Sequence, residues 1–93
     1  MKECVKKEIE KIIEKYDLNC SIEEFQDKVD WNRISIYQKL SLDFIREFQD
    51  EVNWYFISRH QELSKGCMKE FKSKLDWYEI IKNIKIMKNL LMN

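Results

Sequence analysis

The chain has 93 residues, of which 37% are charged and 44% hydrophobic, with one glycine, no proline and a formal net charge of zero. A chain of this length forms a single domain, 1–93, with a modest core. The shortage of glycine and proline disfavours tight β-turns and predicts an all-α fold. A balanced charge argues against non-specific binding of nucleic acid, for which a basic surface dominates affinity.

Charge and cysteine content indicate the environment of the chain. Residues 21–53 carry eight acidic and four basic groups, whereas residues 54–93 carry the reverse. Cys4, Cys20 and Cys67 are odd in number and lack a paired-cysteine spacing, which predicts free thiols in a reducing cytoplasm. No apolar run has the length of a signal peptide or a membrane span, so no membrane partner is expected.

The first predicted element is an amphipathic helix over 2–17. Val5, Ile9, Ile12, Ile13 and Tyr16 recur at helical spacing, with Lys and Glu on the remaining faces. Since nothing later in the chain matches it, residues 1–20 are predicted to be a capping helix.

A 23-residue repeat follows. The stretch Phe25–Trp31 returns as Phe48–Trp54 and again as Phe71–Trp77. A fixed period of this size is typical of stacked helical units that cannot bury their apolar faces alone. The predicted units are 22–44, 45–67 and 68–93, and they form a compact stack of short antiparallel helix pairs.

Capping residues divide each repeat into two short helices. Ser21 and Glu24 form a capping box, Ser41 and Ser64 precede the next helices of the same type, and an Asp or Asn precedes each repeat tryptophan. The last helix keeps its apolar spacing nearly to the end of the chain and is therefore predicted to be long. The predicted helices after the first are 22–29, 31–39, 42–52, 54–63, 65–75 and 77–91.

Equivalent positions of the three copies act as controls for one another. The columns that are apolar in every copy are predicted to be core. They are Trp31, Trp54 and Trp77; Ile34, Ile57 and Ile80; Phe25, Phe48 and Phe71; and Val29, Val52 and Leu75. Gln38 and Gln61 align with Ile84, and Ser35 and Ser58 align with Ile81, which predicts half-buried side chains that bond a neighbouring turn.

Some columns mix apolar and charged residues, and these predict a binding surface. Phe56 aligns with Arg33 and Glu79, Ile36 with Arg59 and Lys82, and Leu42 with Lys65, so the three hydrophobic residues are expected to face solvent. Aromatic and arginine side chains dominate binding hot spots. The predicted partner-binding residues are Arg33, Ile36, Leu42, Tyr55, Phe56, Arg59 and Tyr78. The alternative is that Phe56 and Ile36 pack under a terminal helix.

Catalytic and metal-binding patterns are missing from the sequence. His60 aligns with Tyr37 and Asn83, and Cys67 aligns with Phe44, so neither position is dedicated to chemistry. The Cys and His spacings lack the paired ligands of a zinc site, and the sole glycine, Gly66, excludes a glycine-rich phosphate loop. No enzyme activity, cofactor or metal is therefore expected.

Two alternatives to a protein-binding module stay open. Lys65, Lys69 and Lys72 are predicted to share one helix face and, with Lys74, Lys82, Lys85 and Lys88, could contact a nucleic-acid backbone. A homodimer or larger homo-oligomer could form through the last helix, where Ile86, Leu90 and Met92 widen the apolar stripe.

The repeat also carries a family resemblance. The pattern Asp/Asn-Trp-x-x-Ile-Ser-x-x-Gln-x-Leu-Ser-x-x-Phe-Ile-x-x-Phe spans Asp30 to Phe48, and Asn53 to Phe71 repeats it with Cys67-Met68 in place of Phe-Ile. Over residues 22–81 it resembles the short helical repeats of large DNA virus and phage proteins. The resemblance implies an all-helical fold without catalytic residues. It further implies a small inhibitor that binds a host protein in the host cytoplasm, with defence systems such as CRISPR effectors among the targets.

Overall fold

Seven helices make up the computed structural model, which describes the backbone of residues 1–92 and the side chains of residues 1–84. No strand occurs in residues 1–92, so the predicted all-α fold is confirmed. The helices are α1 (Glu3–Lys15), α2 (Phe25–Lys28), α3 (Trp31–Tyr37), α4 (Leu42–Glu47), α5 (Trp54–His60), α6 (Lys65–Glu70) and α7 (Trp77–Met92).

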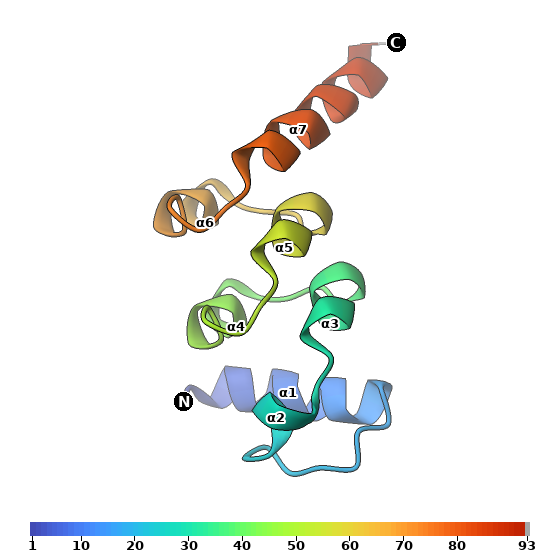
Figure 1. The fold of residues 1–93 in the computed structure, drawn as a ribbon, viewed down its shortest axis with the longest axis vertical. Helices are drawn as coiled ribbons and strands as arrows, with labels where there is room; N and C mark the ends of the chain where they lie inside the picture. Colours follow the sequence, from blue (N-terminus) through green and yellow to red (C-terminus); the bar gives the residue numbers. More distant parts are fainter. Residues whose placement is uncertain (93) are drawn as a thin grey trace.

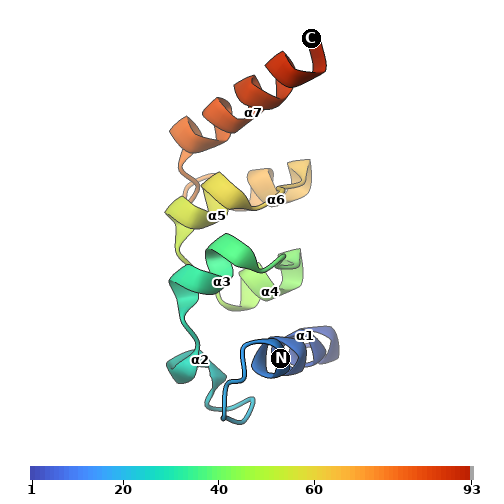
Figure 2. The same ribbon diagram turned by 90° about the vertical axis from the view of Figure 1, so that its right-hand side faces the viewer.

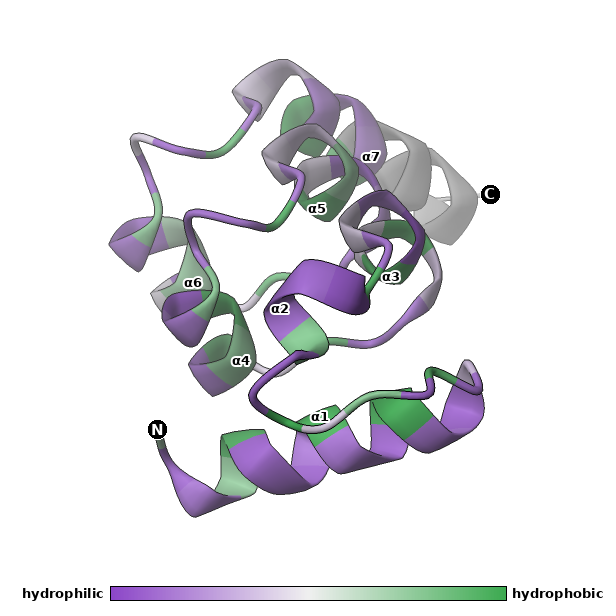
Figure 3. Ribbon diagram, turned by 60° about the horizontal axis from the view of Figure 1, so that its bottom comes forward, coloured by the Kyte–Doolittle hydropathy of each residue, from purple (hydrophilic) through white to green (hydrophobic). Residues whose placement is uncertain are grey.

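The helices rise in chain order from α1 and α2 at one end to α7 at the other, over extents of 46 × 24 × 19 Å (Figure 1). Figure 2 shows two columns, with α2, α3 and α5 in one and α1, α4 and α6 in the other. Helix α3 contacts α5, α5 contacts α7, and α1 lies against α4. The apolar side of α1 faces the other helices and its hydrophilic side faces outward (Figure 3). The core therefore runs between the two columns, and α1 closes one end of it.

Each repeat tryptophan fixes the start of its helix to the chain before it. The indole N–H of every copy donates a hydrogen bond to the backbone carbonyl five residues earlier. The three bonds join Trp31 to Gln26, Trp54 to Gln49 and Trp77 to Lys72, at 3.0, 2.9 and 2.9 Å. Trp31 and Trp54 are half-buried and Trp77 is 39% exposed, so this predicted core column is only partly covered. The repeated tryptophan therefore holds the turn before its helix by a hydrogen bond, in addition to making apolar contacts.

The predicted helix caps are present from the second helix of the first repeat onward. Ser21 and Glu24 exchange the hydrogen bonds of the predicted capping box, through the Ser21 N–H and the Glu24 N–H, but α2 begins only at Phe25 and has no side-chain cap. Each helix from α3 to α7 begins with a side-chain oxygen that accepts from the N–H three residues on. These caps are Asp30, Ser41, Asn53, Ser64 and Asp76. The first free amides of these helices are therefore satisfied, as the sequence predicted.

The predicted helix ends were wrong for the shorter helices. Helices predicted over 42–52 and 65–75 stop at Glu47 and Glu70, and the helix predicted over 22–29 covers only Phe25–Lys28. After α4 and α6 the chain makes a turn, in which the Phe48 carbonyl accepts from the N–H groups of Glu51 and Val52, and the Phe71 carbonyl from those of Lys74 and Leu75. As a result Lys72 lies beyond α6, so the predicted face of three lysines on one helix does not exist.

Buried hydroxyl groups join successive repeats. The Oγ of Ser35 donates to the carbonyl of Trp31 and accepts from the N–H of Asn53 at 3.2 Å. The Oγ of Ser58 makes the same pair of bonds to Trp54 and to the N–H of Asp76, at 2.7 and 2.9 Å. Both serines are buried rather than half-buried as predicted. Their burial is tolerated because each hydroxyl both donates and accepts a hydrogen bond.

Helix α1 ends in a left-handed residue that is not glycine. Asp17 has φ of 53°. The N–H of Leu18 donates to the carbonyl of Ile13, and the N–H of Asp17 donates to that of Glu14, which is the Schellman pattern. Ile13 and Leu18 both lie against the core. The motif turns the chain away from α1 toward the first repeat.

A chain of charged side chains crosses the outer side of α1, α4 and α6. Arg46 contacts Glu70 through two bonds of 2.6 and 2.7 Å and Asp43 through one of 2.8 Å, and Lys2 contacts Asp43 at 3.0 Å. These bonds lower the pKa of Glu70, chiefly through Arg46, and the pKa of Asp43, chiefly through Lys2. The carboxylates of Glu70 and Asp43 therefore ionise more readily in the folded chain than in the unfolded chain.

The first prediction concerns the acid sensitivity of this charge chain. A lowered folded-state pKa contributes stability above the ordinary pKa, which is 4.5 for Glu70, and this stability is lost as the pH falls through the folded value. We expect Arg46→Gln to flatten the decrease in the free energy of unfolding below that pH, measured by urea titration at neutral pH and in acid. The decrease that remains comes from Asp43 with Lys2 and from Glu24 with Ser21. If the free energy of unfolding of Arg46→Gln and of the wild type decreased equally in acid, the stabilising role of the Arg46–Glu70 pair would be contradicted.

Candidate functional site

The seven residues predicted to bind a partner do not form one continuous strip. Leu42, at the start of α4, is half-buried and lies against the core. Its expected exposure is wrong, because α1 covers α4 while the aligned Lys65 starts a helix that has no counterpart of α1 on it. Leu42 therefore belongs to the interior.

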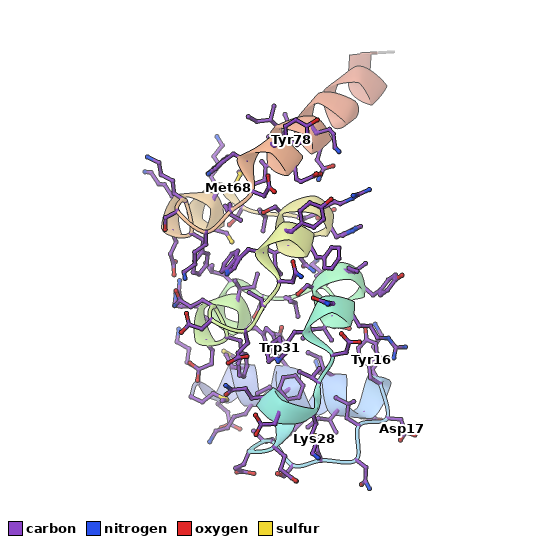
Figure 4. All side chains as sticks on the ribbon, viewed as in Figure 1. Tyr16, Asp17, Lys28, Trp31, Met68 and Tyr78 are labelled. Carbon is purple, nitrogen blue, oxygen red and sulfur yellow. The ribbon has the colours of Figure 1, made fainter. Side chains whose placement is uncertain are left out.

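Arg33 lies at the end of the stack that α1 closes. Its guanidinium is 4.8 Å from the ring centroid of Tyr16, which follows the last residue of α1. Figure 4 shows Tyr16 near this end and Tyr78 at the start of α7, well apart. Arg33 thus tethers α3 to α1 through a cation–π contact and is separated from Tyr78.

Ile36 is half-buried on α3. Together with Tyr37, it lines an open hollow of about 280 Å³ with His60 and Gln61 from the next repeat. Tyr37 is 73% exposed at the edge of this hollow. The expectation of a solvent-facing Ile36 is therefore only partly met.

Helix α5 carries an exposed aromatic and basic group. The Tyr55 hydroxyl accepts a hydrogen bond of 2.9 Å from Nη1 of Arg59, one helical turn later. The half-buried ring of Phe56 lies 5.4 Å from the Tyr55 ring and 6.0 Å from that of His60. The expectation that Phe56 faces solvent is therefore only partly met.

Helix α7 repeats the arrangement in the same register. Tyr78 is 73% exposed, and the ammonium group of Lys82 lies 5.4 Å from its ring centroid. Tyr78 and Lys82 occupy the positions of Tyr55 and Arg59 one repeat later. Because α5 contacts α7, the two pairs lie on adjacent helices. We call Tyr55, Arg59, Tyr78 and Lys82 the tyrosine–cation face.

One aligned position misleads about exposure. The charged Glu79, which aligns with Phe56, predicts that this position faces solvent in every repeat, yet Glu79 is 5% exposed. Its Oε2 lies 3.4 Å from the ammonium group of Lys82 and has no hydrogen-bond partner. Lys82 itself is absent from the predicted partner-binding residues and was considered only for contact with nucleic acid. The tyrosine and the cation four residues apart, at equal positions of two repeats, are the signal that would have found it.

Two kinds of reactive group, the cysteine thiols and the metal-ligating side chains, can be located in the described residues. Burial raises the pKa of the Cys67 thiol, which disfavours the reactive thiolate. Cys4 is exposed and Cys20 half-buried, and both are free. Within residues 1–84, no three side chains of His, Cys, Asp or Glu come together as a metal site.

Three comparisons with known proteins were made. No family model, curated protein or solved structure matches the chain. The resemblance to viral and phage repeats therefore stays a prediction. In the part of the chain that the structure describes, no helix has the length and apolarity needed to cross a membrane.

Proposed function

We propose that the chain is a non-enzymatic module that binds a partner protein through the tyrosine–cation face. The observation that carries this proposal is the repetition of an exposed tyrosine with a cation one turn later on two adjacent helices. Tyrosine and arginine are enriched among residues that dominate binding energy. Their rigid mounting on packed helices lowers the entropy lost on binding.

The charge of the face suggests the chemistry of the partner. Arg59 contributes a positive charge to it, the charge of Lys82 is paired with Glu79 at 3.4 Å, and residues 54–93 carry twice as many basic as acidic groups. Complementary charge speeds association and selects among partners. We therefore propose an acidic surface on the partner. That this partner is a host protein, inhibited on binding, is a proposal that comes from the sequence resemblance.

The second prediction tests the face directly. Tyr55→Ala combined with Tyr78→Ala is expected to weaken binding to a partner, isolated by affinity capture from host lysate, by at least about thirtyfold, the effect of one hot-spot residue. The dissociation constant would be measured by calorimetry on the purified pair. Tyr37→Ala is the matched control, because Tyr37 is as exposed as Tyr78 but lies outside the face.

Either of two results would contradict this assignment. In one, Tyr37→Ala weakens binding as much as the double variant does. In the other, the captured partner is nucleic acid, whose affinity for the chain would fall steeply with added salt. Partner binding that is lost in the double variant and retained in Tyr37→Ala, with moderate salt dependence, is the expected outcome.

A further inference from the structure

Glu79 is a buried carboxylate on the helix that carries half of the tyrosine–cation face. It is 5% exposed, and its Oε2 finds no hydrogen-bond donor within residues 1–84. It forms an ion pair with Lys82, whose ammonium group lies 3.4 Å from Oε2. Burying a carboxylate costs free energy unless hydrogen bonds replace those that it made with water. A carboxylate here is therefore expected to lower the stability of the fold compared with an apolar side chain.

The preceding repeats show that the fold does not require a carboxylate at this position. Phe56 occupies it on α5 and is half-buried, and Arg33 occupies it on α3 and is exposed. An apolar side chain and a cation are thus both accepted at the same place in the helix. Replacing a buried ion pair by apolar side chains is often neutral or stabilising. The presence of Glu79 is therefore not explained by packing.

Two ordinary roles of a glutamate in the first turn of a helix do not account for Glu79. In a capping box its carboxylate would accept from the N–H of Asp76, as Glu24 accepts from that of Ser21. The Asp76 N–H instead donates to the Oγ of Ser58 at 2.9 Å. A carboxylate near a helix N-terminus also interacts favourably with the helix dipole. The equivalent helices α3 and α5 begin without an acidic residue in the first turn, so the fold does not depend on this interaction.

The ammonium group of Lys82 connects Glu79 to the tyrosine–cation face. It lies 3.4 Å from Oε2 of Glu79 and 5.4 Å from the centroid of the Tyr78 ring. A lysine side chain loses much conformational freedom when it is held in one place. Attraction to both the carboxylate and the ring offsets this loss before a partner arrives. The carboxylate thus has a consequence for the face that an apolar side chain would not have.

We propose that Glu79 is a positioning residue of the tyrosine–cation face, which fixes the Lys82 ammonium group against the Tyr78 ring and neutralises its charge. On α5 the guanidinium of Arg59 is bonded instead to the neutral Tyr55 hydroxyl, a contact that leaves its charge in place. The α5 half of the face therefore selects an acidic group, whereas the α7 half presents a preformed aromatic contact with little net charge. This inference rests on the proposed function, since it assigns a role within the same face.

Residues 76–82, which carry this proposal, lie within the part of the chain whose side chains the structure describes. Ile86, Leu90 and Met92, through which the sequence predicts a homodimer, lie outside that part, as do Lys85 and Lys88. The proposed role of Glu79 does not depend on them.

The third prediction concerns Glu79→Met in the full chain, which keeps the length of the side chain and removes its charge. We expect an equal or higher midpoint of urea unfolding than in the wild type, because the variant no longer buries a carboxylate. In NMR spectra, the ε-methylene protons of Lys82 should lose the upfield shift that the Tyr78 ring gives them in the wild type. Tyr78→Leu defines the unshifted position of these protons.

Partner binding is expected to weaken in the same variant. The dissociation constant for the partner obtained by affinity capture should rise about threefold to tenfold, the cost of ordering one long side chain on binding. It is measured at about 0.5 M salt, where the attraction of the freed Lys82 charge for an acidic partner is screened. Glu70→Met is the matched control, since it changes the net charge equally but breaks the ion pair with Arg46 on α6, in the other column of helices (Figure 2). It should lower the unfolding midpoint and leave the Lys82 shift and partner binding unchanged.

An unmoved Lys82 resonance in Glu79→Met would overturn the proposed role of Glu79. So would a lower unfolding midpoint, which would make Glu79 a residue of the fold rather than of the face. Unchanged partner binding in Glu79→Met, where Tyr55→Ala with Tyr78→Ala has abolished it, would overturn the role as well. The proposed function fails on a different result, which is partner binding retained by that tyrosine double variant.

Discussion

Replacing Phe44 with alanine is expected to lower the free energy of unfolding by about 3–5 kcal/mol. Phe44 is fully buried, and its ring centroid lies 6.2, 6.2 and 4.8 Å from those of Phe25, Trp31 and Phe48. Removing it takes away apolar contacts and leaves a cavity that the surrounding rings cannot close. A domain of this size has about 5–15 kcal/mol in total, so the variant would be close to unfolding.

The repeat supplies the control for this prediction. Cys67 occupies the position of Phe44 and is also buried, but it has far fewer atoms to lose. We expect Cys67→Ala to cost about 1 kcal/mol, the value of roughly one buried methylene. Urea unfolding followed by circular dichroism measures both costs. Equal costs would show that the aromatic cluster contributes little beyond the apolar column that both repeats share.

The sequence predicted the parts of the fold that each repeat makes within itself. Ser41 and Asn53 cap the helices that were expected of them, because a cap needs only the three residues that follow it. Helix ends were predicted less well. After α4 the Phe48 carbonyl accepts from the N–H groups of Glu51 and Val52 in a turn, and the apolar spacing that continues to Val52 does not distinguish this turn from a longer helix.

Aligning the copies failed where the ends of the stack differ from its middle. Leu42 looked exposed because Lys65 stands at the same position, but α1 covers only the first of these helices. Ser35 and Ser58 are predicted to be half-buried because Ile81 occupies their column, yet both serines are buried and Ile81 is 54% exposed. Tyr55 and Tyr78 are 41% and 73% exposed, in agreement with their prediction as surface residues. Equivalent positions share an environment only where each has neighbours on both sides.

Gln61→Ala is expected to lower the free energy of unfolding by about 2–3 kcal/mol, because it would leave several backbone groups without partners. The Gln61 side chain accepts from the N–H of Leu40 at 3.2 Å and donates to the carbonyls of Ser35 and Gln38 at 2.9 and 2.7 Å. These groups lie just beyond the end of α3 or in its last turns. One amide therefore terminates a helix and joins two repeats.

Gln38→Ala is the matched control, since Gln38 holds the same position one repeat earlier but accepts only one exposed bond, from Lys15. We expect it to cost less than about 0.5 kcal/mol, as surface substitutions usually do. Gln61→Glu separates the roles of the two ends of the amide. The carboxylate can still accept from Leu40, but it cannot donate, and it brings a negative charge toward two carbonyl oxygens. If the carboxylate variant were as stable as the wild type, the donated bonds would not hold the repeats together, and the apolar columns alone would account for their cohesion.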